Sequence, residues 1–422
     1  MGEVLALAQV WLWGRFLGAV AEEDDGRVTF EYDEAFRQSG LEISPRKLPL
    51  SVRGPVTFPD LNRTEAFGGL PGVLADALPD RFGNAIIRMY FENQGRADLA
   101  MSPVQKLLYM GTRAMGALEF RPPIRGGTTE RERQSLVLAD LVAQARQVVE
   151  GRTDVAVPEI MRVGSSAGGA RPKAVLLWDR ARGIVRSGHA DPAPGEEPWI
   201  IKFDGVGELG APSATSQPHN RIEYVYSLMA GDAGLDMPQT ELLVERGYSH
   251  LMVKRFDRRD GTKLHLHSLG GLEHSDYNSP GTCSYEQFLR VTLALGLGYP
   301  ALEQAFRRAC FNIMAVNQDD HVKNVSFLMD EGGRWILAPA YDLTYARGTG
   351  FTRQHQMTLG GKRDGFTSHD LVDLGARFGI KRHGRPVVDQ VRAALDRWHA
   401  LATQWGVPAD LVAQIQSRFR LT

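Results

Sequence analysis

The stretch Asn317-Gln-Asp-Asp-His-Val-Lys-Asn-Val-Ser-Phe327 decides how the whole chain is interpreted. It places an acid at Asp319 and an amide at Asn324, and a second acid follows at Asp342. Phosphoryl transfer from ATP requires one carboxylate that orients the attacking hydroxyl and accepts its proton. It also requires an amide and a second carboxylate that hold Mg²⁺ against the phosphates. These residue types, in this order, predict a kinase.

The same residue types also occur in ordinary turns, because short polar side chains bond the local backbone, so the surrounding pattern matters. Residues 301–317 carry apolar side chains at helical spacing, which predicts a buried helix that ends at the acids. Residues 325–328 and 335–338 predict two short strands joined by a glycine-containing turn. Such a hairpin would set Asp342 beside Asn324, in the order that protein kinases use.

Length and composition restrict the class of protein. The chain of 422 residues is long enough for two or three domains. Its 49 basic and 50 acidic side chains give no overall positive field that would favour nucleic acid. Cys283 and Cys310 are too few for a disulfide framework or a thiolate metal site.

The chain also carries no pattern that predicts export or membrane insertion. The apolar start, residues 4–20, lacks the basic beginning of a signal peptide. Its continuation to Tyr32 instead predicts a β-hairpin with an acidic turn. No stretch reaches the roughly 18 apolar residues that a membrane helix needs. We therefore expect a cytoplasmic protein.

A glycine-rich stretch runs from Gly164 to Lys173, before a strand predicted at residues 174–178. Backbone N–H groups in such a loop can approach phosphate oxygens, and Arg171 or Lys173 can add positive charge. The stretch is not a Walker A loop, because Gly-Lys-Ser/Thr is absent. A strand-loop-strand lid over ATP, as in protein kinases, agrees better with the strand that follows.

Lys202 lies inside the apolar stretch Trp199-Ile-Ile-Lys-Phe203, which predicts a strand. A buried ammonium needs a phosphate or a carboxylate as partner, whereas a lysine on an edge strand would point into solvent. Glu223, in a helix predicted to end at Gly234, is either that partner or a residue that stabilises the helix dipole. The sequence leaves these alternatives open.

Strands are predicted at residues 241–244 and 251–254, and helices dominate afterwards, starting with the capping-box pattern Ser284-Tyr-Glu-Gln287. The junction Arg255-Phe256-Asp257-Arg258 is where a hinge that binds adenine through main-chain groups would lie. The order of parts is therefore glycine loop, strand lysine, helix glutamate, hinge, acid with amide, and metal-binding acid. That order is typical of a two-lobed kinase.

With these residues, the chain resembles the HipA family of serine/threonine kinases, which are toxins of bacterial toxin-antitoxin pairs. The resemblance includes Gly68-Gly-Leu-Pro-Gly-Val-Leu-Ala-Asp-Ala-Leu-Pro-Asp80. It is most specific at Asp319-Asp-His-Val-Lys-Asn324, which is similar to the family signature D-x-H-x-K-N. It implies an α+β, two-lobed, protein-kinase-like fold of the HipA type. The implied parts are an N-terminal subdomain at 1–145, a β-rich nucleotide-binding lobe at 146–260 and a mainly helical catalytic lobe at 261–422.

The resemblance also implies roles for individual residues. Asp319 would be the catalytic residue, and Asn324 and Asp342 would bind Mg²⁺. Ser166 matches a glycine-loop serine whose autophosphorylation switches family members off, but the adjacent Ser165 leaves open which serine is modified. The residues expected to contact ATP are Gly168, Gly169, Ala170, Arg171, Lys173, Lys202, Lys254, Arg255, Phe256, His321, Lys323 and Tyr341.

The partners that the resemblance implies are a small helix-turn-helix antitoxin of the HipB type, with DNA bound through it, and a protein substrate. In some family members that substrate is an aminoacyl-tRNA synthetase. Two other classes of function stay open. One is a kinase of a small molecule, and the other is a binding module that holds ATP or the antitoxin and helps to repress its operon. The intact acid, amide and second acid favour phosphate transfer over binding alone.

Metal-assisted hydrolysis at Asp319, Asp320 and His321 is a further alternative. Three contiguous side chains cannot all point at one ion from a regular strand or helix, which disfavours this alternative. We therefore expect Asp320 to face solvent and His321 to orient the loop by hydrogen bonding.

Overall fold

The computed structural model describes residues 3–92, 101–122, 135–151, 160, 171–209 and 211–419. The chain divides into two compact units. Unit 1 comprises Met1–Gln217, Glu241–His267 and Asp330–Gly333, and unit 2 comprises Pro218–Thr240, Ser268–Met329 and Arg334–Thr422. Unit 1 contains most of the described strands and unit 2 is mainly helical. The boundaries of the three parts expected from the sequence stay a prediction.

A five-stranded antiparallel sheet forms the N-terminal part of unit 1. Its strands are β1 (Val4–Leu12), β2 (Arg15–Glu23), β3 (Val28–Tyr32), β4 (Val56–Thr57) and β5 (Leu118–Arg121), in the order β4-β3-β2-β1-β5. Trp13 and Gly14 join β1 to β2 with φ angles of 48° and 73°, as a two-residue hairpin turn requires. Strands β2 and β3 form the hairpin with the acidic turn that the sequence predicts.

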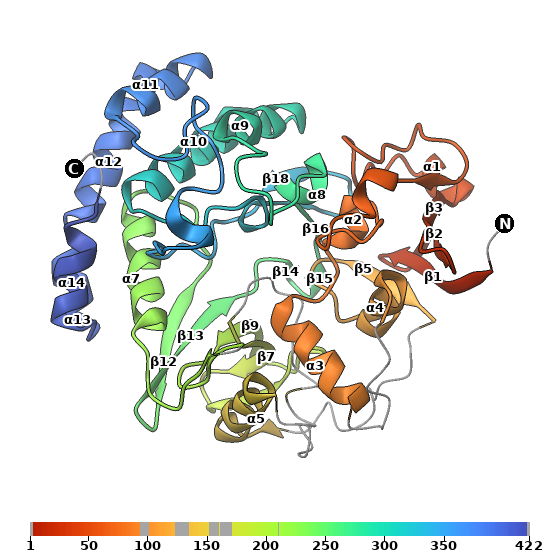
Figure 1. The fold of residues 1–422 in the computed structure, drawn as a ribbon, viewed down its shortest axis with the longest axis horizontal. Helices are drawn as coiled ribbons and strands as arrows, with labels where there is room; N and C mark the ends of the chain where they lie inside the picture. The colour runs from red at the N-terminus through yellow and green to blue at the C-terminus, as the bar shows by residue number, and fades with distance from the viewer. Residues whose placement is uncertain are drawn as a thin grey trace. The chain divides into compact units, whose positions relative to one another are not determined.

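A six-stranded sheet in unit 1 carries the strand lysine. Its strands are β6 (Ser135–Leu136), β7 (Lys173–Asp179), β8 (Ile184–Ser187), β9 (Glu196–Lys202), β12 (Thr240–Glu245) and β13 (Tyr248–Lys254), in the order β12-β13-β9-β7-β8-β6. Helices α3 (Arg81–Glu92) and α5 (Leu138–Glu150) share one hydrophobic core with β7 and β9 (Figure 1). Strand β9 is therefore an interior strand, where a continuous apolar run is expected.

The motif at residues 68–80 does not lie in one helix. The structure has a short helix α2 (Gly72–Ala75) and then the separate helix α3. Pro79 separates the two, because a proline disfavours helical conformation in the residue before it. Asp80 then begins α3 by accepting the Gly83 N–H at 2.6 Å.

A buried chain of hydrogen bonds joins distant segments of unit 1. The Ser44 hydroxyl lies 3.0 Å from His267 Nε2, and His267 Nδ1 lies 2.7 Å from Asp76 Oδ2. This is the order of groups in a serine hydrolase triad. Ser44 is only 1% exposed, however, so a substrate carbonyl cannot reach its hydroxyl. The chain of bonds therefore ties α2 and the Ser44 loop to the strand β16 (His265–Ser268).

Unit 2 is mainly helical. Its helices are α7 (His219–Asp232), α8 (Leu269–Glu273), α9 (Tyr285–Ala294), α10 (Gly298–Met314), α11 (Ser368–Arg377), α12 (Arg385–Leu395), α13 (Trp398–Gln404) and α14 (Ala409–Gln416). Helix α10 is buried along residues 305–314, as predicted, and it ends three residues earlier than the pattern indicates. Strands β17 (Ser326–Met329) and β18 (Trp335–Leu337) pair as the predicted antiparallel hairpin.

Only half of the predicted capping box forms at the start of α9. The Ser284 hydroxyl accepts the Gln287 N–H at 3.1 Å. The Gln287 side chain donates to Glu273 at 2.6 Å instead of returning to Ser284. A contact with a neighbouring helix has therefore replaced the local bond.

The other described elements are short. They are α1 (Glu34–Gln38), α4 (Pro103–Met110), β10 (Gly207–Glu208), β11 (Ala211–Pro212), β14 (Arg258–Arg259) and β15 (Thr262–Lys263), with single turns of 3-10 helix between them. Among the helices of the described ranges, none combines the length and the apolar character needed to cross a membrane.

The residues after the strand lysine are fixed by a buried carboxylate. Asp204 accepts the backbone N–H groups of Gln217 at 2.7 Å and Ser249 at 2.9 Å. Its own N–H donates to His250 Nδ1 at 3.0 Å, so the imidazole carries its proton on the other nitrogen. Protonating Nδ1 would remove this acceptor from a buried ring.

Acid is expected to destabilise the protein through His250. Burial lowers the pKa of His250 to about 4, although the Asp204 carboxylate acts in the opposite direction. An unfolded histidine titrates near about 6.5, so between about pH 6.5 and about pH 4 the unfolded chain binds a proton that the folded chain does not. The stabilisation is therefore complete above about pH 6.5 and falls as the pH decreases, with about 2 kcal/mol lost by about pH 5.

This pH dependence can be measured from urea unfolding midpoints at several pH values. The loss on acidification should be smaller in His250→Asn, whose side-chain oxygen can still accept the Asp204 N–H. The exposed His399 provides a control, and His399→Asn should keep the slope of the unmodified protein. An equal slope in His250→Asn and the unmodified protein would refute the assignment.

Candidate active site

The predicted acid, Asp319, and the predicted amide, Asn324, lie in one loop of residues 317–324. Val316, just before it, has a φ of 57°, a strained conformation for a β-branched residue that persists only where surrounding contacts fix it. Residues 322–324 form one turn of 3-10 helix. Within the loop, Asn324 Nδ2 donates to the Asp319 carbonyl at 2.9 Å, which leaves the Asn324 amide oxygen directed elsewhere as a candidate ligand.

The hairpin β17–β18 returns the chain to this loop, as predicted. The Tyr341 hydroxyl donates to the Lys323 carbonyl at 2.6 Å and lies 2.6 Å from Ser326 Oγ. The next residue, Asp342, has a φ of 53°, in the left-handed region that aspartate tolerates better than most residues. Tyr341 therefore anchors the second acid beside the loop.

His321 lies near both acids. Burial lowers the pKa of His321, while the carboxylates of Asp319 and Asp342 act in the opposite direction. Two acids that are 23 residues apart in sequence thus act on one imidazole, which is neutral at pH 7.

The prediction that His321 orients the loop by hydrogen bonding was wrong. Its Nε2 lies 3.9 Å from Asp319 Oδ1, which is too long for a hydrogen bond. Its Nδ1 is buried and has no hydrogen-bond partner among the described residues. The ring instead packs near Tyr277, with ring centres 5.7 Å apart. Lys323 lies over the same Tyr277 ring at 5.1 Å.

The two neighbouring acids have opposite surroundings. The Asp319 side chain is 43% exposed, whereas the Asp320 side chain is fully buried. The Asp320 carboxylate accepts hydrogen bonds from the Tyr285 hydroxyl at 2.5 Å, from His355 Nδ1 at 2.8 Å and from the Gln356 N–H at 2.6 Å. The prediction that Asp320 faces solvent was therefore wrong, because three donors from distant parts of unit 2 surround it.

The donor atoms of this site fit Mg²⁺. The expected ligands are the Asn324 amide oxygen and the Asp342 carboxylate, and Mg²⁺ takes oxygen ligands at sites that it shares with substrate phosphates and water. In the part of the chain that the structure describes, no three Asp, Glu, His or Cys side chains gather where they could hold a metal ion alone. The arrangement thus fits an ion that is held jointly with a phosphate-bearing ligand.

Unit 1 contains a pair of buried lysines. Lys173 of β7 and Lys202 of β9 are direct partners in the ladder, so their side chains project from the same face of the sheet. Lys173 is 3% exposed and Lys202 is 8% exposed, which excludes the solvent-facing alternative for Lys202. Asp80 Oδ2 lies 3.9 Å from Lys173 Nζ. Two buried ammonium groups on one face favour an anion nearby.

Sequence analysis missed Asp80 as a neighbour of Lys173. The available signal was an acid directly before a helix in the motif at residues 68–80, which predicts a helix cap. The cap does form, but the second carboxylate oxygen is the one that faces Lys173. The sequence contains nothing that pairs two residues so far apart.

The predicted hinge residues differ in which of their groups can reach a ligand. Lys254 forms an ion pair with Glu197. The Arg255 guanidinium is buried and makes two hydrogen bonds to Asp257, at 2.9 and 2.8 Å. The Arg255 N–H donates to the Pro198 carbonyl at 2.9 Å, so of the two main-chain groups of Arg255 the carbonyl is the candidate for a contact with adenine.

Asp257 fixes the chain just after the hinge. Burial alone would raise the pKa of the Asp257 carboxyl, but the guanidinium groups of Arg255 and Arg258 hold it far below its usual value. The Gly116 N–H also donates to this carboxylate at 2.8 Å. The hinge is therefore attached to the N-terminal part of unit 1 by a buried ionic cluster.

The glycine loop lies outside the described residues, including Ser165, Ser166, Gly168, Gly169 and Ala170. Arg171 and Lys173, at the start of the next described range, are the nearest parts that the structure places.

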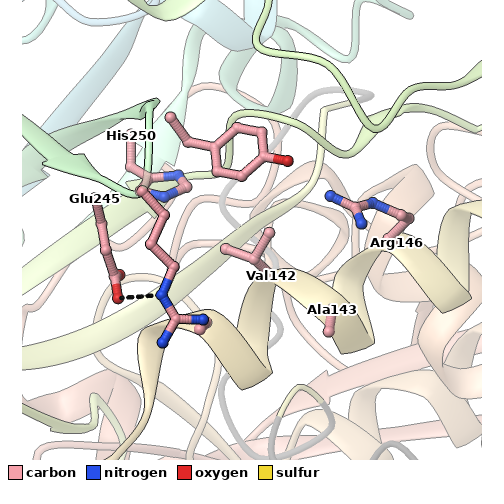
Figure 2. Close-up of a pocket in the computed structure, with 8 residues that line it drawn as sticks. Val142, Ala143, Arg146, Glu245 and His250 are labelled. Carbon is pink, nitrogen blue, oxygen red and sulfur yellow. Dashed lines mark ion pairs between the residues drawn. The ribbon is translucent and has the colours of Figure 1, made fainter.

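A pocket of about 180 Å³ lies in unit 1 between α5 and the β12–β13 hairpin (Figure 2). It is smaller than the roughly 300 Å³ at which small-molecule sites begin. Its polar groups serve the fold, because Arg146 donates to the Gly205 carbonyl at 2.6 Å and Glu245 pairs with Arg246 at 3.9 Å. None of the predicted site residues lines it. The lining residues are Ala139, Val142, Ala143, Arg146, Glu245, Arg246, Tyr248 and His250.

Known proteins resemble this chain over most of its length. In Sinorhizobium fredii, the protein named "Putative kinase Y4mE" is 26% identical over 352 residues, which cover 79% of this chain and 76% of that protein. "Putative kinase Y4dM" of the same organism is 23% identical over 429 residues, which cover 94% of this chain and 91% of that protein.

A solved structure has the same fold. It is the Shewanella oneidensis MR-1 HipA, in a complex with HipB and operator DNA, with a TM-score of 0.65 and 17% identity. The match covers 97% of this chain and 95% of that chain. The likeness shows the two-lobed α+β fold of the HipA type, as the sequence predicts.

Two family models match this chain, one in its N-terminal part and one in its C-terminal part. The model described as the HipA N-terminal domain matches residues 8–121, and the model described as the HipA-like C-terminal domain matches residues 165–399. The second match alone covers more than half of the chain and includes the acids, the amide and both buried lysines. The chain belongs to the HipA family.

Proposed function

We propose that the protein is an ATP-dependent protein serine/threonine kinase that acts as the toxin of a toxin-antitoxin pair. The observation that carries the proposal is the bond from the Asn324 amide to the Asp319 carbonyl, with Asp342 returned to the same loop. An exposed acid, an amide oxygen and a second acid are the groups that phosphoryl transfer requires.

In the proposed mechanism, Asp319 accepts the proton of the substrate hydroxyl. Its side chain is 43% exposed, so a hydroxyl group can approach it. Asn324 and Asp342 would hold Mg²⁺, the first through its amide oxygen and the second through its carboxylate. A bound Mg²⁺ supplies positive charge that neutralises the phosphates during transfer. Asp320 points away from this chemistry into the protein.

Lys173 and Lys202 are proposed to contact the phosphates of ATP, because their burial on one face of the sheet favours an anionic partner. Main-chain groups of Lys254, Arg255 and Phe256 are proposed to hold the adenine, with Arg255 offering its carbonyl. The other residues proposed to contact ATP are Gly168, Gly169, Ala170, Arg171, His321, Lys323 and Tyr341.

The proposed partner is a HipB-like helix-turn-helix antitoxin with operator DNA bound through it. The Shewanella oneidensis protein of similar fold was solved with HipB and operator DNA, which supports a partner of this kind. The proposed substrate is a cellular protein, and an aminoacyl-tRNA synthetase is the first to test. The reaction would take place in the cytoplasm, where ATP and the translation machinery meet.

Two alternatives are separated by one experiment with labelled ATP and a cell lysate. Label on a protein band supports the proposal, whereas label on a small molecule supports a small-molecule kinase. A chain that binds ATP and the antitoxin but transfers no label would be a non-catalytic co-repressor. The exposed Asp319 favours transfer, because binding alone has no use for a positioned base.

Asp319→Asn should abolish phosphate transfer, because the amide cannot accept the hydroxyl proton. Removing a positioned general base lowers the rate by about 10² to 10⁴. The measurement is the initial rate with Mg²⁺ and ATP, together with the unfolding midpoint as a test of folding. Asp389→Asn, at an exposed position of α12, is the matched control. Activity of the Asp319→Asn protein near that of the control would remove Asp319 from the mechanism.

Lys202→Met should weaken ATP binding, because the thioether keeps the length of the side chain and removes its charge. A hydrogen bond to a charged group is worth enough to change the dissociation constant by about 10- to 100-fold. Calorimetry with a non-hydrolysable ATP analogue and Mg²⁺ measures this constant. Lys47→Met, at an exposed lysine, should bind like the unmodified protein. Equal affinity in all three proteins would contradict a role for Lys202 in nucleotide binding.

Autophosphorylation of Ser166 is proposed to switch the enzyme off. A phosphate adds roughly −1.5 to −2 charges to a loop that is proposed to hold the triphosphate, so the loop or the nucleotide should be repelled. Mass spectrometry after incubation with Mg²⁺ and ATP should find one phosphate on the peptide that contains Ser165 and Ser166. Ser166→Ala should remove it and Ser165→Ala should retain it. The opposite result would move the modified residue to Ser165, and full activity of the phosphorylated protein would defeat the switch.

A further inference from the structure

Asp320 is one of the most thoroughly bonded carboxylates in unit 2, although it adjoins the exposed Asp319. Its two oxygens accept three hydrogen bonds, from a tyrosine hydroxyl, an imidazole nitrogen and a backbone N–H, all within 2.8 Å. The Tyr285 hydroxyl, His355 and Gln356 that supply them are all buried, as is Asp320 itself. A carboxylate is stable at such a depth only if donors of this kind surround it.

Two of the donors belong to the chain that follows the second acid. His355 and Gln356 lie in residues 351–359, here called the 351–359 segment. The Gln356 side chain also donates to the Gln318 carbonyl at 3.0 Å, one residue before Asp319. The segment is therefore bonded to the 317–324 loop on both sides of the proposed catalytic residue.

The third donor attaches the same segment to α9. Tyr285 is the first residue of that helix, and its N–H donates to the Thr358 carbonyl at 2.9 Å. The Thr358 N–H donates to the Cys283 carbonyl at 3.0 Å, and the Gly281 N–H donates to the Gln356 carbonyl at 2.8 Å. The 351–359 segment is thus held between the start of α9 and the 317–324 loop. The Asp320 carboxylate of that loop is bonded to both the helix and the segment.

We propose that Asp320 is a positioning residue that fixes the Asp319 carboxylate by holding the 317–324 loop on the 351–359 segment. This inference rests on the proposed function for its effect on catalysis. The Asp320 side chain is fully buried and the adjacent Asp319 side chain is 43% exposed, so anchoring Asp320 inward holds Asp319 on the exposed side of the loop. In protein kinases the chain after the metal-binding acid must be in place for activity. Here a carboxylate of the loop itself holds that chain.

Asp320→Asn tests the proposal with little change in volume. The new NH₂ group would face donors, so at least one of the three hydrogen bonds is lost. A small displacement of a catalytic group can lower the rate by about 10². We expect kcat to fall by up to that factor, while KM for ATP stays within about twofold, because none of the Asp320 bonds involves a residue proposed to contact ATP.

Tyr285→Phe provides a milder variant in case Asp320→Asn folds poorly. It removes one donor and keeps the ring, so kcat should fall less than in Asp320→Asn. Residues that act as a unit give non-additive effects, so the double variant should lose little more than Asp320→Asn alone. If the fall in kcat of the double variant equals the product of the falls in the two single variants, Asp320 and Tyr285 act independently and the proposal is overturned.

Leu395→Ala is the control for a general loss of stability. Leu395 is buried in α12 of the same unit, and truncating a buried leucine destabilises a protein markedly. The concentration of urea can be chosen so that both variants are equally far below their unfolding midpoints. A fall in kcat of the same size in Leu395→Ala as in Asp320→Asn would show that Asp320 acts only through stability and would overturn the proposal.

Hydrogen exchange separates this proposal from the proposed function. The Gln356 N–H donates directly to Asp320, so exchange in the 351–359 segment should be accelerated more in Asp320→Asn than in Leu395→Ala, which lowers the stability of the unit as a whole. This measurement needs no activity. Faster exchange together with an inactive unmodified protein would sink the proposed kinase and keep the anchoring role of Asp320. Unchanged exchange with an active unmodified protein would sink the anchoring role alone.

Discussion

The cost of burying charge governs the arrangement of the predicted site residues within each of the two units. An isolated buried ion costs several kcal/mol, so each one must be surrounded by donors or by opposite charge. Asp320 has three donors, Asp257 has two guanidinium groups, and Lys173 faces Asp80. Such clusters add little net stability, but breaking them is costly, so they hold their neighbours in one geometry. Each cluster contains or adjoins a residue with a proposed role in phosphate transfer.

Local patterns predicted most of the fold, because helix and strand periodicities are properties of neighbouring residues. The helix before the acids and the hairpin after them were both found where their apolar residues indicate. The motif at residues 68–80 contains the short helix α2, and the next helix begins just after it. Pro79 separates the two, because a proline disfavours helical conformation in the residue before it.

The candidate site was less predictable, because its buried partners come from distant sequence. The donors to Asp320 are 35 and 36 residues away, so nothing near the Asp319-Asp320 pair tells which acid faces inward. The sequence could not predict whether Lys202 is buried or exposed for the same reason, because its burial depends on the strands that flank β9. The sequence did predict that the second acid returns to the loop of the first acid and the amide, because only a short hairpin lies between them.

Burial of His321 also bears on the chemistry of the loop. A protonated imidazole 3.9 Å from Asp319 would stabilise the ionised carboxylate, reduce its affinity for a substrate proton and repel a divalent cation. Burial keeps the ring neutral, although both acids favour its protonation. The neutral ring therefore adds no positive charge beside Asp319 and Asp342, which both act on it. A neutral imidazole at this position is compatible with the Mg²⁺ ion that we propose Asn324 and Asp342 would hold.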